Sequence, residues 1–130
     1  MKKVYPIILT PAERGYVVYV PDLQINTEGN DIADAIDMAR DAIGLWGITE
    51  EDLDRSIPEP TTVSVEQIEH GPGEIVTLVD IDFAAYRRAH DMRTVRKNVT
   101  LPGWLSAEAE KAGVNFSQVL QEALKERLKV

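Results

Sequence analysis

Thr94-Val95-Arg96-Lys97-Asn98-Val99-Thr100-Leu101 has the pattern of an extended chain with two different faces. Successive side chains of a strand point to opposite faces. One face would be polar and the other mainly apolar: Thr94, Arg96, Asn98 and Thr100 against Val95, Val99 and Leu101. The pattern predicts a strand that packs one face against a core and leaves hydrogen-bonding groups on the other.

Two helical patterns follow this strand. Pro102 suits a first helical turn because it lacks an N–H, and the first helix stops at Gly113, a typical residue just after a helix end. Asn115 is a good N-cap for the second helix, with Gln118 three positions later. The second helix has a broad apolar face, formed by Phe116, Val119, Leu120, Ala123, Leu124 and Leu128.

The module over residues 93–130 is too small to bury that face alone. Chains below roughly 40 residues rarely hold a core without disulfides, a metal or oligomerisation. The sequence contains no cysteine. We therefore expect an intertwined homodimer.

R-K-N-V-T-L-P (96–102) ahead of G-V-N-F-S-Q-V-L-Q-E-A-L (113–124) resembles a ribbon-helix-helix DNA-binding domain. The resemblance implies that two strands pair across a dimer axis and enter the major groove. It assigns base contacts to Arg96, Asn98 and Thr100, and phosphate contacts to Lys97, Asn115, Phe116 and Ser117. Arginine and asparagine suit guanine and adenine, and a helix N-terminus suits a phosphate. The alternative is a dimerising helical hairpin behind a merely solvated strand.

Charge divides the chain at the same point. Residues 1–92 hold 7 Lys and Arg against 18 Asp and Glu, a net −11. Residues 93–130 hold 7 against 4, a net +3. This division suggests a nucleic acid as partner of the basic part and a cationic partner for the acidic part. The alternative interpretation is that the acidic residues of this part only make the protein soluble.

The acidic part predicts a β-β-β-α-β order. Apolar runs at 4–9 and 16–20 are separated by a loop with Pro and Gly, and Pro6 favours an edge position for the first run. A third strand is expected over 23–27. A helix capped by Asp31 follows, with an apolar stripe that ends at Trp46.

The rest of the acidic part gives weaker signals. A separate helical turn is expected over 49–54, and 63–68 fits a strand or a helix. A strand is expected over 74–81, followed by a helix from 83 to about 90 with Asp82 as cap. The fold class is α+β: a small sheet with one main helix over 1–92, then the ribbon-helix-helix module over 93–130.

G-Y-V-V-Y-V-P-D-L (15–23) followed by T-E-G-N-D-I-A-D-A-I (27–36) resembles the N-terminal domain of the HicB antitoxin family. With the terminal module, the likeness extends over nearly the whole chain. It implies a degenerate ribonuclease-H-like sheet that covers a small basic HicA toxin, an mRNA-cleaving ribonuclease, in a complex that represses its own promoter. By charge and expected exposure, the candidate toxin contacts are Asp22, Glu28, Asp31, Asp34 and Asp37, some of which could instead serve the helix dipole.

An active ribonuclease-H site needs several carboxylates around two divalent metals, and the first predicted strand supplies none. Asp80 and Asp82 are the best remaining metal pair, although a helix cap and a solvated end residue explain them more simply. His70 and His90 lie in no cluster. We expect no enzyme activity, no catalytic residue, no metal and no cofactor.

The sequence has no long apolar run and no signal-peptide pattern. We expect a cytoplasmic protein of a bacterium or archaeon, on the nucleoid when bound to its operator. The expected partners are a HicA-like toxin, operator DNA and a second copy held through the C-terminal module, with a larger heteromeric assembly as an option. Two alternatives stay open: a stand-alone ribbon-helix-helix regulator with a ligand-sensing or oligomerising N-terminal domain, and a metal-dependent hydrolase.

Overall fold

The computed structural model describes residues 2–61 and 64–130, and the chain divides into two compact units. Unit 1 is Met1–Arg93 and unit 2 is Thr94–Val130. The predicted boundary lies one residue earlier. Each unit is described by itself below.

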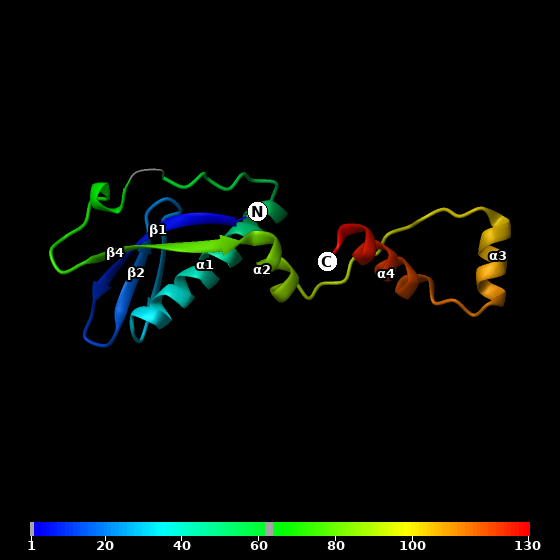
Figure 1. Cartoon of the computed structure of the whole chain (residues 1–130), viewed down its shortest axis with the longest axis horizontal. Helices are drawn as coiled ribbons and strands as arrows, with labels where there is room; N and C mark the ends of the chain where they lie inside the picture. Colours follow the sequence, from blue (N-terminus) through cyan, green and yellow to red (C-terminus); the bar gives the residue numbers. More distant parts are fainter. Residues whose placement is uncertain (1, 62–63) are drawn as a thin grey trace. The chain divides into compact units, whose positions relative to one another are not determined.

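Unit 1 is an α+β layer in which an antiparallel sheet carries one long helix (Figure 1). The four strands lie in the order β3-β2-β1-β4. Their bounds are Lys2–Pro11 for β1, Tyr16–Val20 for β2, Ile25–Gly29 for β3 and Ile75–Asp82 for β4. The predicted β-β-β-α-β order is confirmed.

β1 is an interior strand, so the prediction that Pro6 marks an edge strand is wrong. The pairing of β1 with β4 runs from Lys2, opposite Asp82, to Leu9. The pairing with β2 starts only at Ile8. At Pro6 the strand therefore has a neighbour on one side only, and a proline is tolerated because the other side needs no N–H donor.

The predicted third strand starts too early. Leu23 is buried in a turn, and its N–H bonds to the Val20 carbonyl at 3.3 Å. Gln24 has φ 54, which interrupts an extended chain. β3 therefore begins at Ile25.

α1 (Ile32–Asp52) begins as predicted, because the Asp31 side chain accepts a hydrogen bond from the Asp34 N–H at 2.7 Å. Its end differs from the prediction of a separate turn over 49–54. Thr49 does not cap a new helix; its Oγ1 donates to the Leu45 carbonyl one turn back, at 2.7 Å. The helix therefore continues through Asp52.

The chain then forms η1 (Val65–Gln67), a short 3₁₀ helix, within the segment 63–68 for which the sequence pattern fits either a strand or a helix. Val63, in the same predicted segment, lies outside the described residues. β4 leads directly into α2 (Phe83–His90), and Asp82 caps this helix by accepting from the Ala85 N–H at 3.1 Å. The predicted cap is confirmed.

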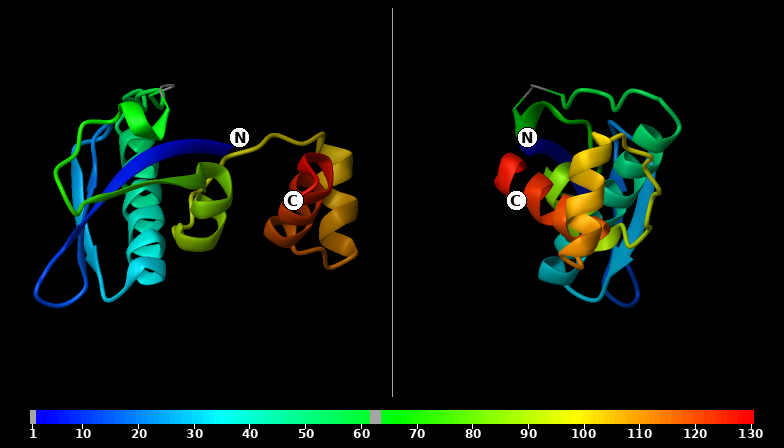
Figure 2. Two further views of the ribbon diagram at one scale, coloured as in Figure 1. Left: turned by 60° about the vertical axis from the view of Figure 1, so that its left-hand side comes forward. Right: turned by 90° about the vertical axis from the view of Figure 1, so that its right-hand side faces the viewer.

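The core of unit 1 lies between the sheet and the helices that pack on it, with α1 along one face (Figure 2). Its fully buried members include Tyr5, Ile7, Leu9, Val18, Val20 and Ile43. Two glycines of α1 allow α2 to approach closely. A Cβ at Gly44 would lie 2.4 Å from the Tyr86 ring, and a Cβ at Gly47 would lie 2.1 Å from the Phe83 ring.

Two further glycines, Gly15 and Gly29, meet where the β1–β2 hairpin touches the start of α1. Gly15 has φ 75, and a Cβ there would lie 2.1 Å from the Gly29 carbonyl oxygen. A Cβ at Gly29 would lie 2.4 Å from the backbone of Ala35. Only glycine fits both positions without a backbone shift.

Unit 2 contains α3 (Gly103–Lys111) and α4 (Phe116–Leu128). Gly113, with φ 71, turns the chain between them, and Asn115 caps α4 by accepting from the Gln118 N–H at 3.1 Å. Pro102 precedes α3 instead of joining its first turn. The segment 94–101 has no regular secondary structure. A strand needs a neighbouring strand to pair with, and the predicted neighbour is the same segment in a second copy of the chain. The predicted ribbon of two strands therefore remains a prediction.

Candidate functional site

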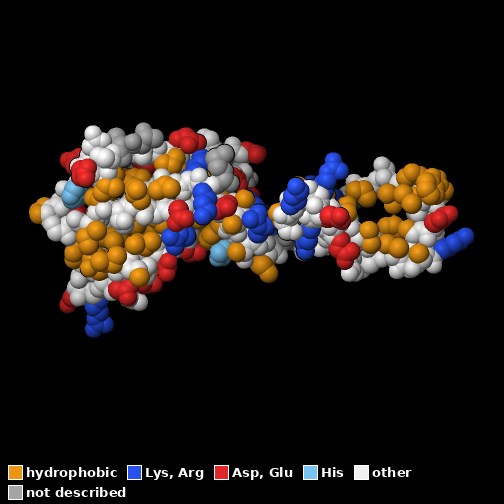
Figure 3. Space-filling model, viewed as in Figure 1, with side chains coloured by type: hydrophobic (Ala, Val, Ile, Leu, Met, Phe, Trp, Pro, Cys, Tyr) orange, Lys and Arg blue, Asp and Glu red, His pale blue; other side chains and the backbone are white. Residues whose placement is uncertain are grey.

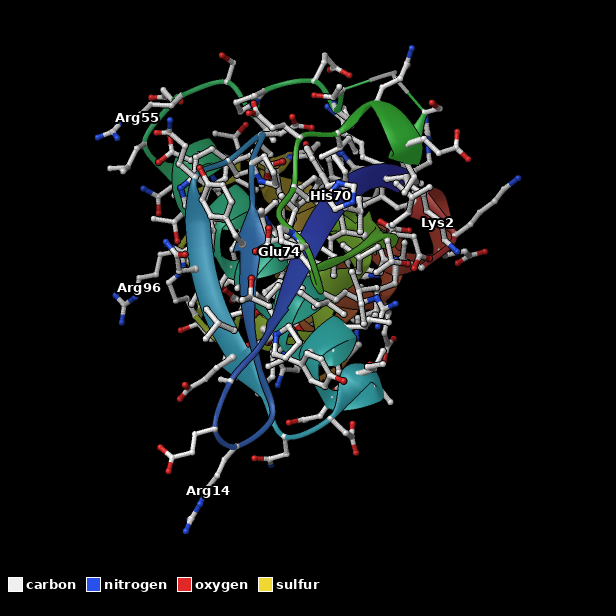
Figure 4. The ribbon with its side chains drawn as sticks, turned by 90° about the vertical axis from the view of Figure 1, so that its left-hand side faces the viewer. Lys2, Arg14, Arg55, His70, Glu74 and Arg96 are labelled. Carbon is white, nitrogen blue, oxygen red and sulfur yellow. The ribbon has the colours of Figure 1, made fainter. Side chains whose placement is uncertain are left out.

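The polar side chains assigned to DNA bases lie on one open segment of unit 2. Arg96, Asn98 and Thr100 are all exposed, as is Lys97 between them. Figure 4 shows the Arg96 side chain extending away from the ribbon. The segment thus presents two cations and two neutral hydrogen-bonding groups within five residues.

The start of α4 has the features expected of a phosphate site. The Asn115 side chain and carbonyl accept the amides of Gln118 and Val119. Within the described chain, the amides of Phe116 and Ser117 make no hydrogen bond, and both residues are exposed. Open N–H groups and the helix dipole together favour an anion at this end.

The apolar face of α4 is uncovered. Phe116, Val119, Leu120, Leu124 and Leu128 are between 38% and 67% exposed. None of the residues of unit 2 is buried. Figure 3 shows the hydrophobic side chains of this unit at its surface. Such a face requires a partner to become a core.

Three of the five acidic residues assigned to toxin contact lie at the start of α1. Asp31 caps the helix, and Asp34 accepts from the Asn30 N–H at 2.8 Å. Asp37 pairs with Arg40 one turn on, at 3.1 Å. All three therefore stabilise the start of α1, in addition to any contact they make with a partner.

The other two acidic candidates lie apart from each other. Glu28 is exposed on β3, close to the start of α1. Asp22 lies in the turn at the opposite end of β2 and β3, where its carboxylate accepts from the backbone N–H of Thr61 at 2.7 Å and also from the Thr61 hydroxyl. The structure does not bring Asp22 together with the other four.

Asp80 and Asp82, the candidate metal pair, are both engaged in the fold. Arg40 donates to the Asp80 carboxylate at 3.1 Å, and this bond lowers the pKa of Asp80 below its ordinary value. The bond from the Ala85 N–H likewise lowers the pKa of Asp82. Across residues 2–61 and 64–130, no group of three or more His, Cys, Asp and Glu residues is arranged to hold a metal ion.

The two histidines also have local partners. His70 Nδ1 lies 2.7 Å from the Ile68 carbonyl oxygen, on the segment that leads past Glu74 into β4 (Figure 4). His90 stacks on the Tyr86 ring with 4.0 Å between ring centroids. In the part of the chain that the structure describes, neither belongs to a group of three or more His, Cys, Asp and Glu residues that could hold a metal ion.

An ion-pair cluster that the sequence did not reveal joins α1 to the end of unit 1. Arg87 contacts Glu51, Asp52 and Asp91 at 3.0, 3.0 and 3.2 Å. Arg93 contacts Asp91 at 2.9 Å and Asp52 at 3.3 Å. The bonds from Arg93 hold the pKa of Asp91 well below its ordinary value. Asp91 and Arg93, which follow α2, are thus tied to unit 1.

The sheet itself has a second surface that the sequence analysis missed. We call the side turned away from α1 the outer face. Its most exposed apolar residues are Val4, Val17, Tyr19 and Leu78, between 36% and 49% exposed. A signal was present in the sequence, because the runs 4–9 and 16–20 are continuously apolar instead of alternating.

No helix among the described residues is long and apolar enough to cross a membrane.

Comparisons with known proteins give one family and several structures. Residues 5–123 match the family model described as the HicB-like antitoxin of bacterial toxin-antitoxin systems. No protein of curated function matches the sequence.

Two solved structures match over nearly the whole chain, and a third matches over 61% of it. The antitoxin HicB of Burkholderia pseudomallei is 27% identical, with 98% of this chain and 97% of that chain covered and a TM-score of 0.55. A chain of a toxin-antitoxin complex from Streptococcus pneumoniae is 22% identical, with 98% and 99% covered and a TM-score of 0.58, a likeness of fold. A chain of the HicA3 and HicB3 toxin-antitoxin complex is 25% identical to this one. The match covers 61% of this chain and 98% of that chain, with a TM-score of 0.52.

Proposed function

The chain belongs to the HicB-like antitoxins of bacterial toxin-antitoxin systems, and we propose that it neutralises a HicA-like ribonuclease through unit 1 and represses its own operon through unit 2. The observation that carries the proposal is the span of the family match, residues 5–123, which includes unit 1 almost entirely and most of unit 2. As an antitoxin, the chain acts by binding and is not an enzyme.

The toxin half of the proposal is supported by charge and by the relatives. Residues 1–92 carry a net −11, which attracts a basic partner and raises its association rate. The HicA3 and HicB3 complex contains a chain 25% identical to this one. A small basic toxin of the HicA kind is therefore the partner we assign to unit 1.

The DNA half is supported by unit 2. Arg96, Asn98 and Thr100 are exposed on a basic segment, and the start of α4 offers open amides for a phosphate. The uncovered face of α4 fits a second copy, and the same dimer would pair the two segments 94–101 as a ribbon. On this proposal the antitoxin–toxin complex lies on the nucleoid, at its own operator.

The test is affinity purification of the tagged full chain from its native cells at mild salt, with mass spectrometry of the proteins that co-purify. We expect a small basic protein in stoichiometric amount, together with operator DNA. A preparation that retains DNA but no second protein would contradict the toxin half and favour a stand-alone regulator. A preparation with the toxin but no sequence-specific DNA would contradict the DNA half.

A further inference from the structure

We propose that the outer face of the sheet in unit 1 is the surface on which the toxin docks. The inference rests on the proposed function and narrows it to one surface. The acidic residues predicted as toxin contacts do not form a single surface. Asp22 lies away from the others, and Asp31, Asp34 and Asp37 stabilise the start of α1.

The outer face forms one continuous apolar patch. Ile8 lies opposite Tyr19 on β2 and opposite Val76 on β4, so the three side chains form a row across three strands. Directly opposed residues have Cβ atoms about 4.5–5.5 Å apart. Val17 and Leu78 extend the row, each two positions along its own strand from a member of it, and in Figure 3 hydrophobic side chains gather over β1 and β2.

The strand sequences have the pattern of a sheet that is covered on both faces. An antiparallel sheet with one solvated face alternates apolar and polar residues, whereas strands covered on both faces are apolar throughout. Y-V-V-Y-V of β2 places Val18 and Val20 in the core and still leaves Val17 and Tyr19 exposed. α1 lies along the inner face (Figure 2), and on the outer face Ile8 is 9% exposed while Val17, Tyr19 and Leu78 remain between 36% and 49% exposed, so these three are available to a partner.

Charge selects a basic partner over a second copy of the chain. Glu28 lies on the outer face of β3, directly opposite Val17, and takes part in none of the ion pairs of the described residues. Asp80 flanks Val4 at the other edge, although Arg40 and Lys2 already pair with it. An apolar centre with an acidic edge fits a basic protein, while a second acidic copy would be repelled.

A matched pair of variants tests the surface. Leu78 on the outer face is 49% exposed and Leu45 on α1 is 55% exposed, so the same substitution can be made on two sides of unit 1. The probe is the toxin recovered by co-purification, titrated by calorimetry into the full chain. We expect Leu78→Lys to weaken binding by about 100-fold or more, and Leu45→Lys to change it by less than about 2-fold.

The outcomes separate the inference from the proposed function. A wild-type chain that binds toxin, with Leu78→Lys binding equally well, would overturn the docking surface and leave the antitoxin function intact. A wild-type chain that binds no toxin would overturn the function itself. Thermal unfolding followed by circular dichroism checks that both variants remain folded.

A second measurement keeps the test decisive if Leu78→Lys does not fold. The chain has no cysteine, so Val17→Cys and Leu45→Cys each carry a single thiol. We expect the toxin to slow the reaction of a thiol reagent at position 17 by about 10-fold or more and to leave position 45 unchanged. Equal rates at position 17 with and without toxin would overturn the inference, whether the face stays open or a second copy already covers it.

Discussion

The two units of this antitoxin satisfy their apolar side chains in different ways. Unit 1 has its own core, with Tyr5, Ile43 and Val79 at 0%, 0% and 1% exposure. In unit 2 no residue is buried, although α4 carries a full apolar stripe. The first unit has what it needs to fold as a monomer, whereas the second needs a partner to complete its structure.

The difference links folding to function. On the proposed function, unit 2 completes its core only in a dimer and reads DNA only as a dimer, so its operator affinity would depend on the concentration of the chain. On the same proposal, unit 1, which has its own core, would bind the toxin without first dimerising. The predictions that follow test this contrast, starting with the largest effect.

The contrast is tested most strongly in the core of unit 1. Ile43→Ala should lower the free energy of unfolding of this unit by about 2–5 kcal/mol, because it removes buried methyl groups and leaves a cavity. The effect should be independent of protein concentration. Denaturant unfolding of the full chain measures it, and Met38→Ala, on the exposed side of the same helix, is the control.

The opposite behaviour is expected on α4. Leu124→Lys should weaken self-association by about 100-fold, because it places a charge in a face that a second copy covers. Analytical ultracentrifugation over a range of concentrations measures the change. Glu122→Lys, which reverses a charge outside the apolar stripe, should leave association nearly intact; equal loss in both variants would contradict the proposed face.

Arg96→Ala separates DNA binding from toxin binding. Loss of a bidentate base contact costs about 1–3 kcal/mol, or about 5–150-fold in operator affinity. Toxin affinity should not change, because Arg96 lies in the other unit. Electrophoretic mobility shift and calorimetry measure the two affinities, with Arg88→Ala on α2 as the control; a parallel loss of both activities would contradict the division of labour.

The smallest effect concerns alkaline pH in unit 1. Burial raises the pKa of Tyr5 to about 12, and its hydroxyl donates to the Pro58 carbonyl at 2.8 Å. The raised folded-state pKa means that this stabilisation is complete below pH 10, the ordinary value, and is lost as pH rises towards 12. Tyr5→Phe should cost about 1 kcal/mol at neutral pH and should flatten the decline above pH 10.

Thermal unfolding of wild type and Tyr5→Phe between pH 7 and pH 11 is the measurement. Tyr86 also has a pKa raised to about 12 by burial, so Tyr86→Phe is the comparison variant. If the two wild-type tyrosines contribute, each variant should remove part of the alkaline destabilisation. An unchanged pH profile in Tyr5→Phe would show that this phenol is not responsible.

The sequence predicted the parts of the fold that depend on local chemistry. Asp31, Asp82 and Asn115 each cap the helix that they were expected to cap, because an N-cap is decided within four residues. The errors arose where distant contacts decide. Thr49 fits a cap as well as a helix interior, and in the continued α1 the neighbouring Ile48 is buried against the rest of unit 1.

The candidate sites show the same limit. The polar side chains of the open segment 94–101 needed no tertiary information, and Arg96, Asn98 and Thr100 are exposed as expected. The apolar face of the same segment, Val95, Val99 and Leu101, was expected to pack against a core and is exposed as well. The acidic candidates needed the path of the chain, because Asp22 and Glu28 lie near opposite ends of the β2–β3 pair. Spacing in the sequence does not reveal that separation.

The register of β1 on β4 has an evolutionary consequence. Lys2, where β1 begins, pairs with Asp82, where β4 ends, so the chain enters and leaves the sheet at adjacent points. Unit 1 is therefore a portable module: a gene fusion or recombination event after Arg93 would exchange unit 2 without disturbing any strand or the ion pairs of Asp91 and Arg93. On the proposed function, exchange of this kind would let one toxin-binding sheet acquire different operators over time.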